Sequence, residues 1–271
     1  MPVVSFIVAG FMKSGTTTLN DYLLLNDEVA MCSPKEPQFF SRNYDKGEAY
    51  YESLWASSNN KICGEASTCY SRWPFYTDVP KRIASYNSEM KFIFIMRHPV
   101  ERAYSHYKHN VLVDNFSYSS FSEALASSDE ILMTSMYMKQ LTRFLDFFSK
   151  EQILLLDFDE LIEGREIINK VERFIGVGVS TTVTQTEMIV SNSAGFSGSK
   201  SDAMYVINRI RNTIIVKTIF NRLICPTSRK KIRRIIERYL KKSFLIKKLS
   251  SRKLKKFKIL SENERINLLR K

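Results

Sequence analysis

Two short polar segments of this sequence, each directly after an apolar run, have the composition of anion-binding loops. The first, KSGTT at residues 13–17, follows the apolar run 3–9. Its small residues leave backbone N–H groups accessible, and a helix that begins there adds the positive end of its dipole. The second begins at Arg97, which follows the apolar run 91–96 and precedes Pro99, a residue suited to the first turn of a helix. Two such cations predict an anion site that suits a nucleotide.

The spacing of the first loop differs from that of an ATP-binding Walker A loop, G-x-x-x-x-G-K-[ST]. Gly10 and Gly15 have the Walker separation, but Thr16 occupies the lysine position and the cation stands upstream, at Lys13. A kinase or ATPase also needs an acidic residue at a strand end to hold Mg²⁺, whereas the second apolar run ends in Arg97. The residues therefore favour a metal-free nucleotide site, with a P-loop nucleotide kinase as the alternative.

These segments resemble the motifs of the sulfotransferases that use 3′-phosphoadenylyl sulfate (PAPS). Residues 13–17 resemble the 5′-phosphosulfate loop of that family, and RHPVERAYS at 97–105 resembles its 3′-phosphate motif. KEPQFF at 35–40 and GEAS at 64–67, with Tyr70, resemble the carbohydrate-acting, heparan-sulfate-like branch. The family is therefore expected to supply the fold and the chemistry.

The resemblance, which runs over residues 5–177, implies PAPS as sulfuryl donor, no metal, and a saccharide hydroxyl as acceptor. Lys13 is expected to stabilise charge on the leaving oxygen. A non-carbohydrate small-molecule hydroxyl is the alternative acceptor, because Ala66 stands where the heparan-type enzymes carry a second active-site lysine. The residues expected to bind the nucleotide, the last of them from a loop over the adenine, are Lys13, Ser14, Gly15, Thr16, Thr17, Arg97, Ser105 and Lys200.

Glu36 is the candidate general base. Pro34 and Pro37 keep its segment extended, so the carboxylate is expected to project from a loop beside the first helix. Transfer to a hydroxyl requires a group that takes up the proton. Spacing alone also fits a solvated Lys35–Glu36 pair, but the resembling family places its base in the same Glu-x-x-Phe-Phe setting.

The elements that must position these residues follow from the apolar pattern. Runs that are apolar on both faces are typical of parallel strands covered by helices, and helical patterns follow several of them. The expected strands are 3–9, 28–32, 62–64, 91–96 and 153–156, and the expected helices include 16–25, 46–55, 121–126, 137–148, 166–175, 204–219 and 228–240. The strand 91–96 is expected beside the first. We predict an α/β fold, a P-loop-like parallel sheet flanked by helices, with a helical basic C-terminal region.

Length and composition indicate one domain. A chain of 271 residues with 44% hydrophobic content can bury a full core. We predict a single domain over 1–271, with a catalytic body at 1–223 and a basic helical extension at 224–271. The capping box at 261–264 places a helix start so near the end that a truncated or frayed C-terminus is expected.

The sequence lacks the apolar stretches of a membrane or secreted protein. No run of 18 apolar residues occurs, and the first strand begins at Val3, so we expect no signal peptide or transmembrane segment and a cytoplasmic location, with peripheral membrane contact as a further possibility. The four cysteines have no C-x-x-C spacing, which favours buried structural thiols in a reducing compartment. They are Cys32, Cys63, Cys69 and Cys225.

The positive charge is concentrated near the C-terminus. The chain has 41 basic and 28 acidic residues, a formal net charge of +13, and 15 of the basic residues lie in 229–258 beside a single acid, Glu237. An anionic membrane surface or a polyanionic acceptor is the expected partner, and a solvated helix packed on the core is the alternative. A non-enzymatic basic protein is the third function class, although the body gives no reason to expect nucleic acid.

Several other residues near these motifs allow a functional and a structural interpretation. His98, His106 and His109 are expected to be solvated helix residues rather than metal ligands, because no matching acidic ligand lies nearby. Asp157, Asp159 and Glu160 resemble a structural turn of the family and are expected to form one, with a metal-binding trio as the alternative. The cluster Tyr70, Arg72, Trp73 and Phe75 fits either stacking on a sugar ring or simple packing.

Overall fold

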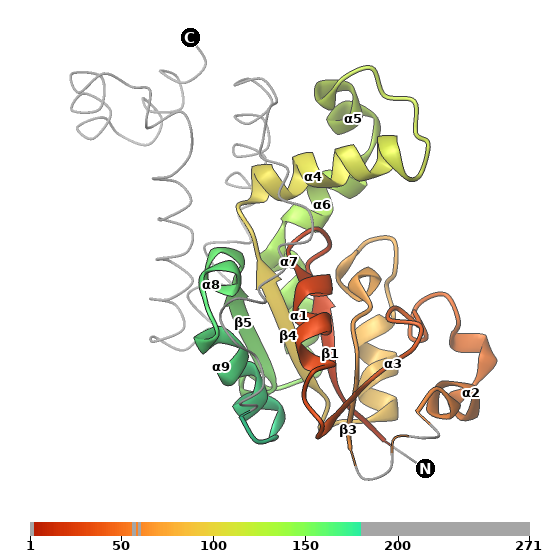
Figure 1. Cartoon of the computed structure of the whole chain (residues 1–271). Helices are drawn as coiled ribbons and strands as arrows, with labels where there is room; N and C mark the ends of the chain where they lie inside the picture. The colour runs from red at the N-terminus through yellow and green to blue at the C-terminus, as the bar shows by residue number, and fades with distance from the viewer. Residues whose placement is uncertain (1–2, 56–57, 59–60, 180–271) are drawn as a thin grey trace. The chain divides into compact units, whose positions relative to one another are not determined.

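The computed structural model describes residues 3–55, 58 and 61–179, all within one compact unit, Met1–Ser197. These residues form a five-stranded parallel sheet with the order β2-β3-β1-β4-β5 (Figure 1). The strands are β1 Val4–Gly10, β2 Val29–Met31, β3 Ile62–Glu65, β4 Lys91–Met96 and β5 Ile153–Asp157. Each predicted strand is present, and β4 lies beside β1 as expected. The α/β prediction is confirmed.

The helices largely follow the predicted pattern. Ser120 caps α5, its side chain accepting from the Glu123 N–H at 3.1 Å, and Gly176 ends α9 in the left-handed conformation, with φ 94°. The helices are α1 Thr16–Leu23, α2 Glu48–Ser53, α3 Val79–Tyr86, α4 Pro99–Leu112, α5 Phe121–Ser127, α6 Asp129–Ser135, α7 Tyr137–Leu145, α8 Phe158–Glu163 and α9 Glu166–Ile175. Short 3₁₀ turns are η1 Tyr44–Lys46, η2 Thr68–Ser71 and η3 Lys150–Gln152.

Both faces of β4 are buried, which explains its unbroken apolar sequence. Ile93 and Ile95 belong to the core cluster that includes residues of α1, α8 and α9, all on one side of the sheet (Figure 1). Phe92 and Phe94 point to the other face, where their rings lie 5.0 and 5.1 Å from that of Phe144 on α7. Because alternate residues of a strand point to opposite faces, helices on both sides require apolar residues at every position.

Two helix predictions are wrong at their ends. Leu25, expected to face the sheet, is 49% exposed, because α1 ends at Leu23 and the helical period no longer applies beyond it. The predicted helix 46–55 is interrupted at Gly47, whose φ of 80° separates η1 from α2. Tyr51 and Trp55 are nevertheless buried as expected. Propensity and period located the core residues better than the element boundaries.

Several predictions concern residues outside the described ranges. They are Lys200 and its loop, the helices 204–219 and 228–240, the basic segment 229–258, the division at 223, the C-terminal capping box and Cys225. Within the described part of the chain, Cys32, Cys63 and Cys69 are free, buried thiols. No helix of that part has the length and apolarity needed to span a bilayer.

Candidate active site

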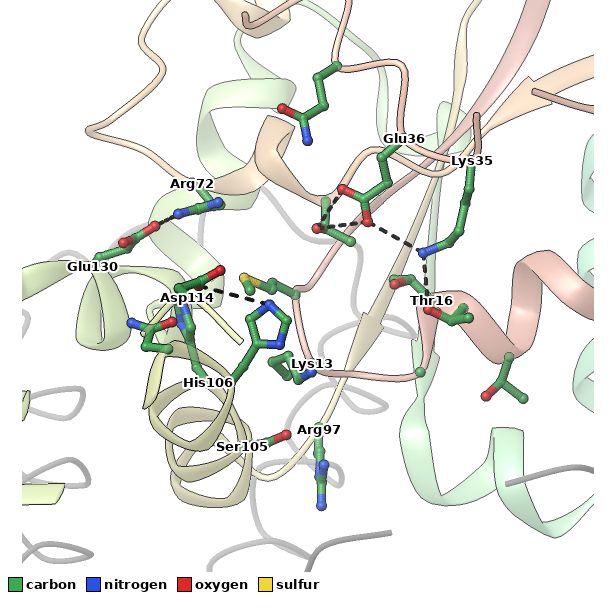
Figure 2. Close-up of a pocket in the computed structure, with 18 of the residues that line it drawn as sticks. Lys13, Thr16, Lys35, Glu36, Arg72, Arg97, Ser105, His106, Asp114 and Glu130 are labelled. Atoms are coloured by element: carbon green, nitrogen blue, oxygen red, sulfur yellow. Dashed lines mark hydrogen bonds and ion pairs between the residues drawn. The ribbon is translucent and has the colours of Figure 1, made fainter. Parts of the chain in front are cut away.

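The two segments predicted to bind anions meet at the carboxyl edge of the sheet. The first follows β1 and the second follows β4, and the Phe11 N–H donates to the Ile95 carbonyl at 3.1 Å, which joins the two strand ends. From β1 the chain first builds β2 and β3 on one side and then crosses to β4 on the other. Ligands of open α/β sheets bind at such a switch point. A cavity of about 670 Å³ lies there (Figure 2).

Most of the predicted site residues line this cavity. The exception among the described residues is Ser14, whose side chain is fully buried and whose N–H donates to the Phe11 carbonyl at 3.0 Å. Ser14 therefore lies inside the loop rather than on its surface. The predicted residues that line the cavity are Lys13, Gly15, Thr16, Thr17, Glu36, Arg97 and Ser105. Figure 2 shows Lys13 between Glu36 on one side and Arg97 with Ser105 on the other.

The loop before α1 has a tight backbone that only small residues allow. Gly15 has φ 87°, and a Cβ there would lie 3.1 Å from side-chain atoms of Phe158 and Leu161. Lys13 also lies in the left-handed region, with φ 67°, which is uncommon for a residue with a side chain. The turn leads directly into α1, whose first N–H groups have no partner within the helix. Loop and helix together have the geometry that suits an anion at a helix N-terminus.

Positive charge accumulates around Lys13. Burial lowers the pKa of its ammonium group, and the nearby charges of Arg97 and Lys35 lower that pKa further. Arg97 is only 6% exposed; its Nε lies 3.4 Å from Glu101 Oε2, and its guanidinium carbon lies 4.7 Å from the centre of the Phe158 ring. Like charges held together in a partly buried site favour the binding of an anion.

Glu36 lies at the edge of the same cavity, held between a cation and a hydroxyl. Its Oε1 is 3.4 Å from Lys35 Nζ, and the Thr68 hydroxyl lies 3.4 Å from both carboxylate oxygens. Lys35 Nζ also donates to Thr17 Oγ1 at 3.1 Å, so this lysine connects the carboxylate to the first turn of α1 (Figure 2). The Lys35–Glu36 pair thus exists, and it faces the anion-binding loop.

A buried carboxylate supports the Glu36 segment from beneath. Glu65, at the end of β3, is fully buried and accepts hydrogen bonds from Tyr51 at 2.6 Å, from Tyr70 at 2.9 Å and from Ser67. Burial raises the pKa of this carboxyl to about 7, although the three hydroxyl donors act in the opposite direction. Glu65 is thus a strong acceptor at the centre of a polar network.

That network reaches the backbone beside the candidate base. The Gln38 N–H donates to Ser67 Oγ at 3.0 Å, and the Phe40 N–H donates to the Tyr70 hydroxyl at 3.2 Å. Both hydroxyls in turn donate to Glu65. The loop that carries Glu36 is therefore fixed to the end of β3 through Glu65.

The prediction that the histidines are solvated is wrong for His106. Its side chain is 1% exposed, and burial together with the nearby Arg102 charge lowers its pKa well below the usual value. Arg102 is itself fully buried and donates to Ser135 Oγ at 2.7 Å and to the Met12 carbonyl at 3.4 Å. The helical pattern of α4 could not show that α6 covers this face. In the described part of the chain, no cluster of three His, Cys, Asp or Glu side chains is placed to hold a metal ion.

Comparison with known proteins identifies the family. The Sulfotransferase domain family matches residues 5–214. This chain belongs to that sulfotransferase family.

The similar curated proteins act on a polysaccharide, by their names. Human heparan sulfate glucosamine 3-O-sulfotransferase 3B1 is 28% identical over 201 residues, which cover 70% of this chain and 50% of that protein. Human bifunctional heparan sulfate N-deacetylase/N-sulfotransferase 3 is 28% identical over 192 residues, which cover 64% of this chain and 22% of that protein. The chain thus spans half of the first relative and a smaller part of the second.

A solved structure shares the fold. The sulfotransferase from Alicyclobacillus acidocaldarius superposes with a TM-score of 0.67 at 23% identity, over 78% of this chain and 92% of that one. The parallel sheet and its flanking helices are therefore the sulfotransferase architecture.

Some residues that line the sulfotransferase cavity had no role in the sequence-based prediction. They are Arg42, Asp114 and Glu130. Arg72 was considered only for sugar stacking or packing, and in the structure it lines the cavity and pairs with Glu130. Tyr70, from the same cluster, is 2% exposed and packs in the core. No local motif marks Asp114 or Glu130. Asp114 lies in the segment after α4 and Glu130 lies on α6, so each belongs to a different segment from the predicted motifs.

Proposed function

We propose that this protein transfers the sulfuryl group of PAPS to a hydroxyl of a carbohydrate. The observation that carries this proposal is the meeting of three features in one cavity: the loop before α1, the Arg97–Ser105 pair and the Glu36 carboxylate. Family membership supports the reaction class. The names of the similar polysaccharide sulfotransferases support a saccharide acceptor.

The donor half of the cavity consists of Lys13, Gly15, Thr16, Thr17, Arg97 and Ser105. Lys13 and the free N–H groups at the start of α1 suit the 5′-phosphosulfate, because they supply a cation and several aligned donors. Arg97 and Ser105 suit the 3′-phosphate, which a guanidinium and a hydroxyl can share. Lys200 remains the predicted cover of the adenine and lies outside the described residues.

The reaction proceeds by in-line displacement at sulfur. Glu36 takes the proton of the acceptor hydroxyl, whose oxygen forms the new bond to sulfur. The bond between sulfur and the bridging oxygen breaks, and its electron pair leaves with adenosine 3′,5′-bisphosphate. Lys13 stabilises the charge that develops on the bridging oxygen. Lys35, between Thr17 and Glu36, holds the base toward the loop.

A binding comparison tests the donor assignment. Adenosine 3′,5′-bisphosphate should raise the melting temperature of the protein, whereas adenosine 5′-monophosphate, which lacks the 3′-phosphate, should do so far less. ATP with Mg²⁺ represents the alternative P-loop kinase. Stabilisation by ATP but not by the bisphosphate would overturn the proposed donor.

A transfer assay tests the acceptor class. Protein supplied with ³⁵S-labelled PAPS should label a polysaccharide mixture that contains both charged and uncharged chains. A panel of phenols and aliphatic alcohols represents the alternative, a non-carbohydrate hydroxyl. Label that enters only this panel would overturn the carbohydrate acceptor and leave the donor assignment intact. The basic segment 229–258 and its anionic membrane partner remain predictions that lie outside the described residues.

A further inference from the structure

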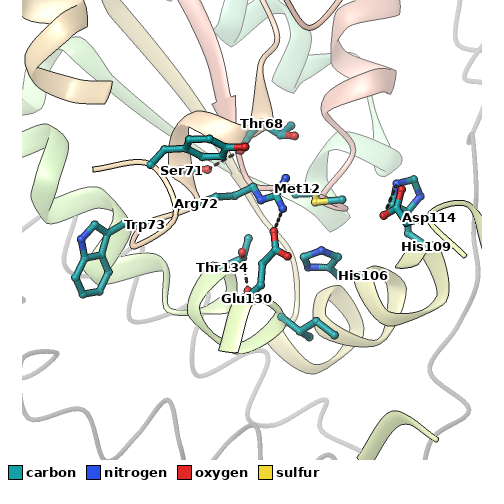
Figure 3. Close-up of polar contacts among 12 residues, drawn as sticks. Met12, Thr68, Ser71, Arg72, Trp73, His106, His109, Asp114, Glu130 and Thr134 are labelled. Carbon is teal, nitrogen blue, oxygen red and sulfur yellow. Dashed lines mark hydrogen bonds and ion pairs between the residues drawn. The ribbon is translucent and has the colours of Figure 1, made fainter. Parts of the chain in front are cut away.

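The cavity has a second half that the donor does not use. This acceptor half consists of Thr68, Arg72, His106, His109, Asp114 and Glu130, all of which line the cavity. Thr68 touches the Glu36 carboxylate, and Arg72 follows it one turn later, at the end of η2. Figure 3 shows Arg72, Glu130 and His106 close together, with His109 and Asp114 to one side. An acceptor that reaches Glu36 would also meet these side chains.

The cation of this half is already neutralised. Arg72 forms an ion pair with Glu130 of α6, and each of the two side chains is only 18% exposed (Figure 3). A pair of this kind is held more firmly than one in open solvent, because water screens it less. The Arg72 Nε–H has no hydrogen-bond acceptor among the described residues.

The remaining acid of this half, Asp114, faces His109 within the half and the Lys13 charge of the donor half. Asp114 Oδ2 lies 4.0 Å from His109 Nε2, but burial and the nearby Lys13 charge lower the pKa of His109 below its ordinary value of 6.5. The cationic form of His109 is therefore disfavoured, so this histidine supplies no fixed positive charge beside the Asp114 carboxylate. An anionic group of an acceptor would be repelled here.

Position 66, where the heparan-type enzymes carry a lysine, supplies no cation in this chain. Ala66, which replaces the lysine of the heparan-type enzymes, is fully buried and belongs to the apolar core cluster. Five cationic and three acidic side chains line the whole cavity, so those side chains carry a net charge of two positive. A single phosphate monoester carries about 1.5 to 2 negative charges at pH 7, and the phosphosulfate adds more. The bound donor therefore outweighs this positive charge.

We infer that the acceptor is an uncharged saccharide, without a carboxylate or sulfate next to the hydroxyl that receives the sulfuryl group. This inference rests on the proposed sulfuryl transfer. Glu130 acts as a specificity residue, because it pairs with the Arg72 guanidinium. Arg42, the other guanidinium that lines the cavity outside the donor half, donates from Nε to the Tyr76 hydroxyl. Sugar hydroxyls, which both donate and accept hydrogen bonds, suit the Asp114 carboxylate and the Thr68 hydroxyl.

A matched pair of acceptor analogues tests the inference. One is a tetrasaccharide of alternating glucuronic acid and N-acetylglucosamine, and the other is the same tetrasaccharide with each carboxylate reduced to a hydroxymethyl group. Calorimetry is done on full-length protein saturated with adenosine 3′,5′-bisphosphate. The native protein should not bind the uronate form more tightly than the reduced form. Tighter binding of the uronate form by about tenfold or more would overturn the inference.

The variant Glu130→Gln provides the second test. It frees the Arg72 guanidinium, so affinity for the uronate tetrasaccharide should rise at least about tenfold, while affinity for the reduced form should change little. The double variant Arg72→Gln/Glu130→Gln should lose the gain. Absence of a gain in Glu130→Gln that still binds the bisphosphate would overturn the inference, whether or not the native protein binds either saccharide.

Two controls keep the outcomes distinct. Glu151→Gln removes an exposed acid remote from the cavity, whose ion pair is with Lys150, and should leave both affinities unchanged. Glu130→Asp keeps a carboxylate in the buried position and should give a smaller gain in affinity for the uronate tetrasaccharide. This variant replaces Glu130→Gln in the test if Glu130→Gln does not fold. Failure of the native protein to bind the bisphosphate would instead overturn the proposed function itself.

Discussion

The donor half and the acceptor half of the cavity differ in how their charges are balanced. In the donor half, burial lowers the pKa of Lys13, and repulsion from the nearby Arg97 and Lys35 charges lowers it further. In the acceptor half, Arg72 is paired with Glu130, and Asp114 adds a negative charge. In the donor half, an anionic ligand would reduce the repulsion between like charges. In the acceptor half, the cation is already paired with a carboxylate, so an anion would gain little there. One cavity can therefore bind a highly charged donor and select an uncharged acceptor.

The largest expected effect tests the residue at the boundary of the two halves. Glu36→Gln keeps the shape of the side chain and removes the base, so turnover should fall by about two to four orders of magnitude, with bisphosphate affinity nearly unchanged. Single-turnover transfer from labelled PAPS measures this, with Glu151→Gln as the matched control. Turnover that survives within a few-fold would show that the proton goes elsewhere.

The second prediction concerns the network beneath Glu36. The pKa of Glu65 is raised to about 7 in the folded protein, against 4.5 when unperturbed, so the folded state binds the proton more tightly between these values. The free energy of unfolding should therefore fall as pH rises from about 5 to 7, by up to about 3 kcal/mol.

The matched variant is Glu65→Gln, which cannot titrate and resembles the protonated acid. Urea unfolding at pH 5, 6, 7 and 8 should show the native protein losing stability relative to this variant across that range. Parallel curves for the two proteins would contradict the raised pKa of Glu65.

The third prediction separates the two anion sites of the donor half. Arg97→Ala should weaken binding of adenosine 3′,5′-bisphosphate by about 1.5 to 3 kcal/mol, the value of a hydrogen bond to a charged group. Adenosine 5′-phosphosulfate, which lacks the 3′-phosphate, should bind as before. Calorimetry with both ligands measures this, and Arg173→Ala, an exposed arginine on α9, is the control. An equal loss for both ligands would show that Arg97 does not bind the 3′-phosphate.

The smallest expected effect concerns the contact between Thr68 and Glu36. Thr68→Val keeps the branched shape and removes the hydroxyl, which lies 3.4 Å from both carboxylate oxygens. Turnover should fall by less than about tenfold, because a hydroxyl shared at 3.4 Å between two carboxylate oxygens forms only a weak hydrogen bond, of about 1 kcal/mol. Thr142→Val on α7, where the hydroxyl donates to the Met138 carbonyl of the same helix, is the control. A loss as large as that of Glu36→Gln would give Thr68 a direct role in the reaction.

The donor half could be predicted from the sequence because its residues are local. Lys13 and Thr17 stand in one segment, and Arg97 and Ser105 in another, each directly after a buried strand whose apolar run is easy to recognise. Parallel strands bring their carboxyl ends to one edge of the sheet, so two local patterns are enough to place both anion sites together.

The acceptor half could not be predicted because its contacts join distant segments. Glu130 reaches Arg72 only because α6 packs on α4, and the burial of His106 has the same cause. The amphipathic pattern of α4 shows one apolar face and gives no sign of which helix covers the other side. Glu65 could be recognised in the sequence as part of the segment 64–67. Its connection to the Gln38 and Phe40 N–H groups, through the Ser67 and Tyr70 hydroxyls, depends on side-chain geometry that residue spacing does not encode.

The left-handed backbone of Lys13 has a consequence for how this position can evolve. A residue with a side chain at φ 67° is less stable there than glycine by about 1 kcal/mol, so Lys13→Gly would relieve strain in the fold. Selection for stability alone would therefore place glycine here. A lysine at this position therefore fits a trade-off in which some stability is given up for a positive charge in the cavity.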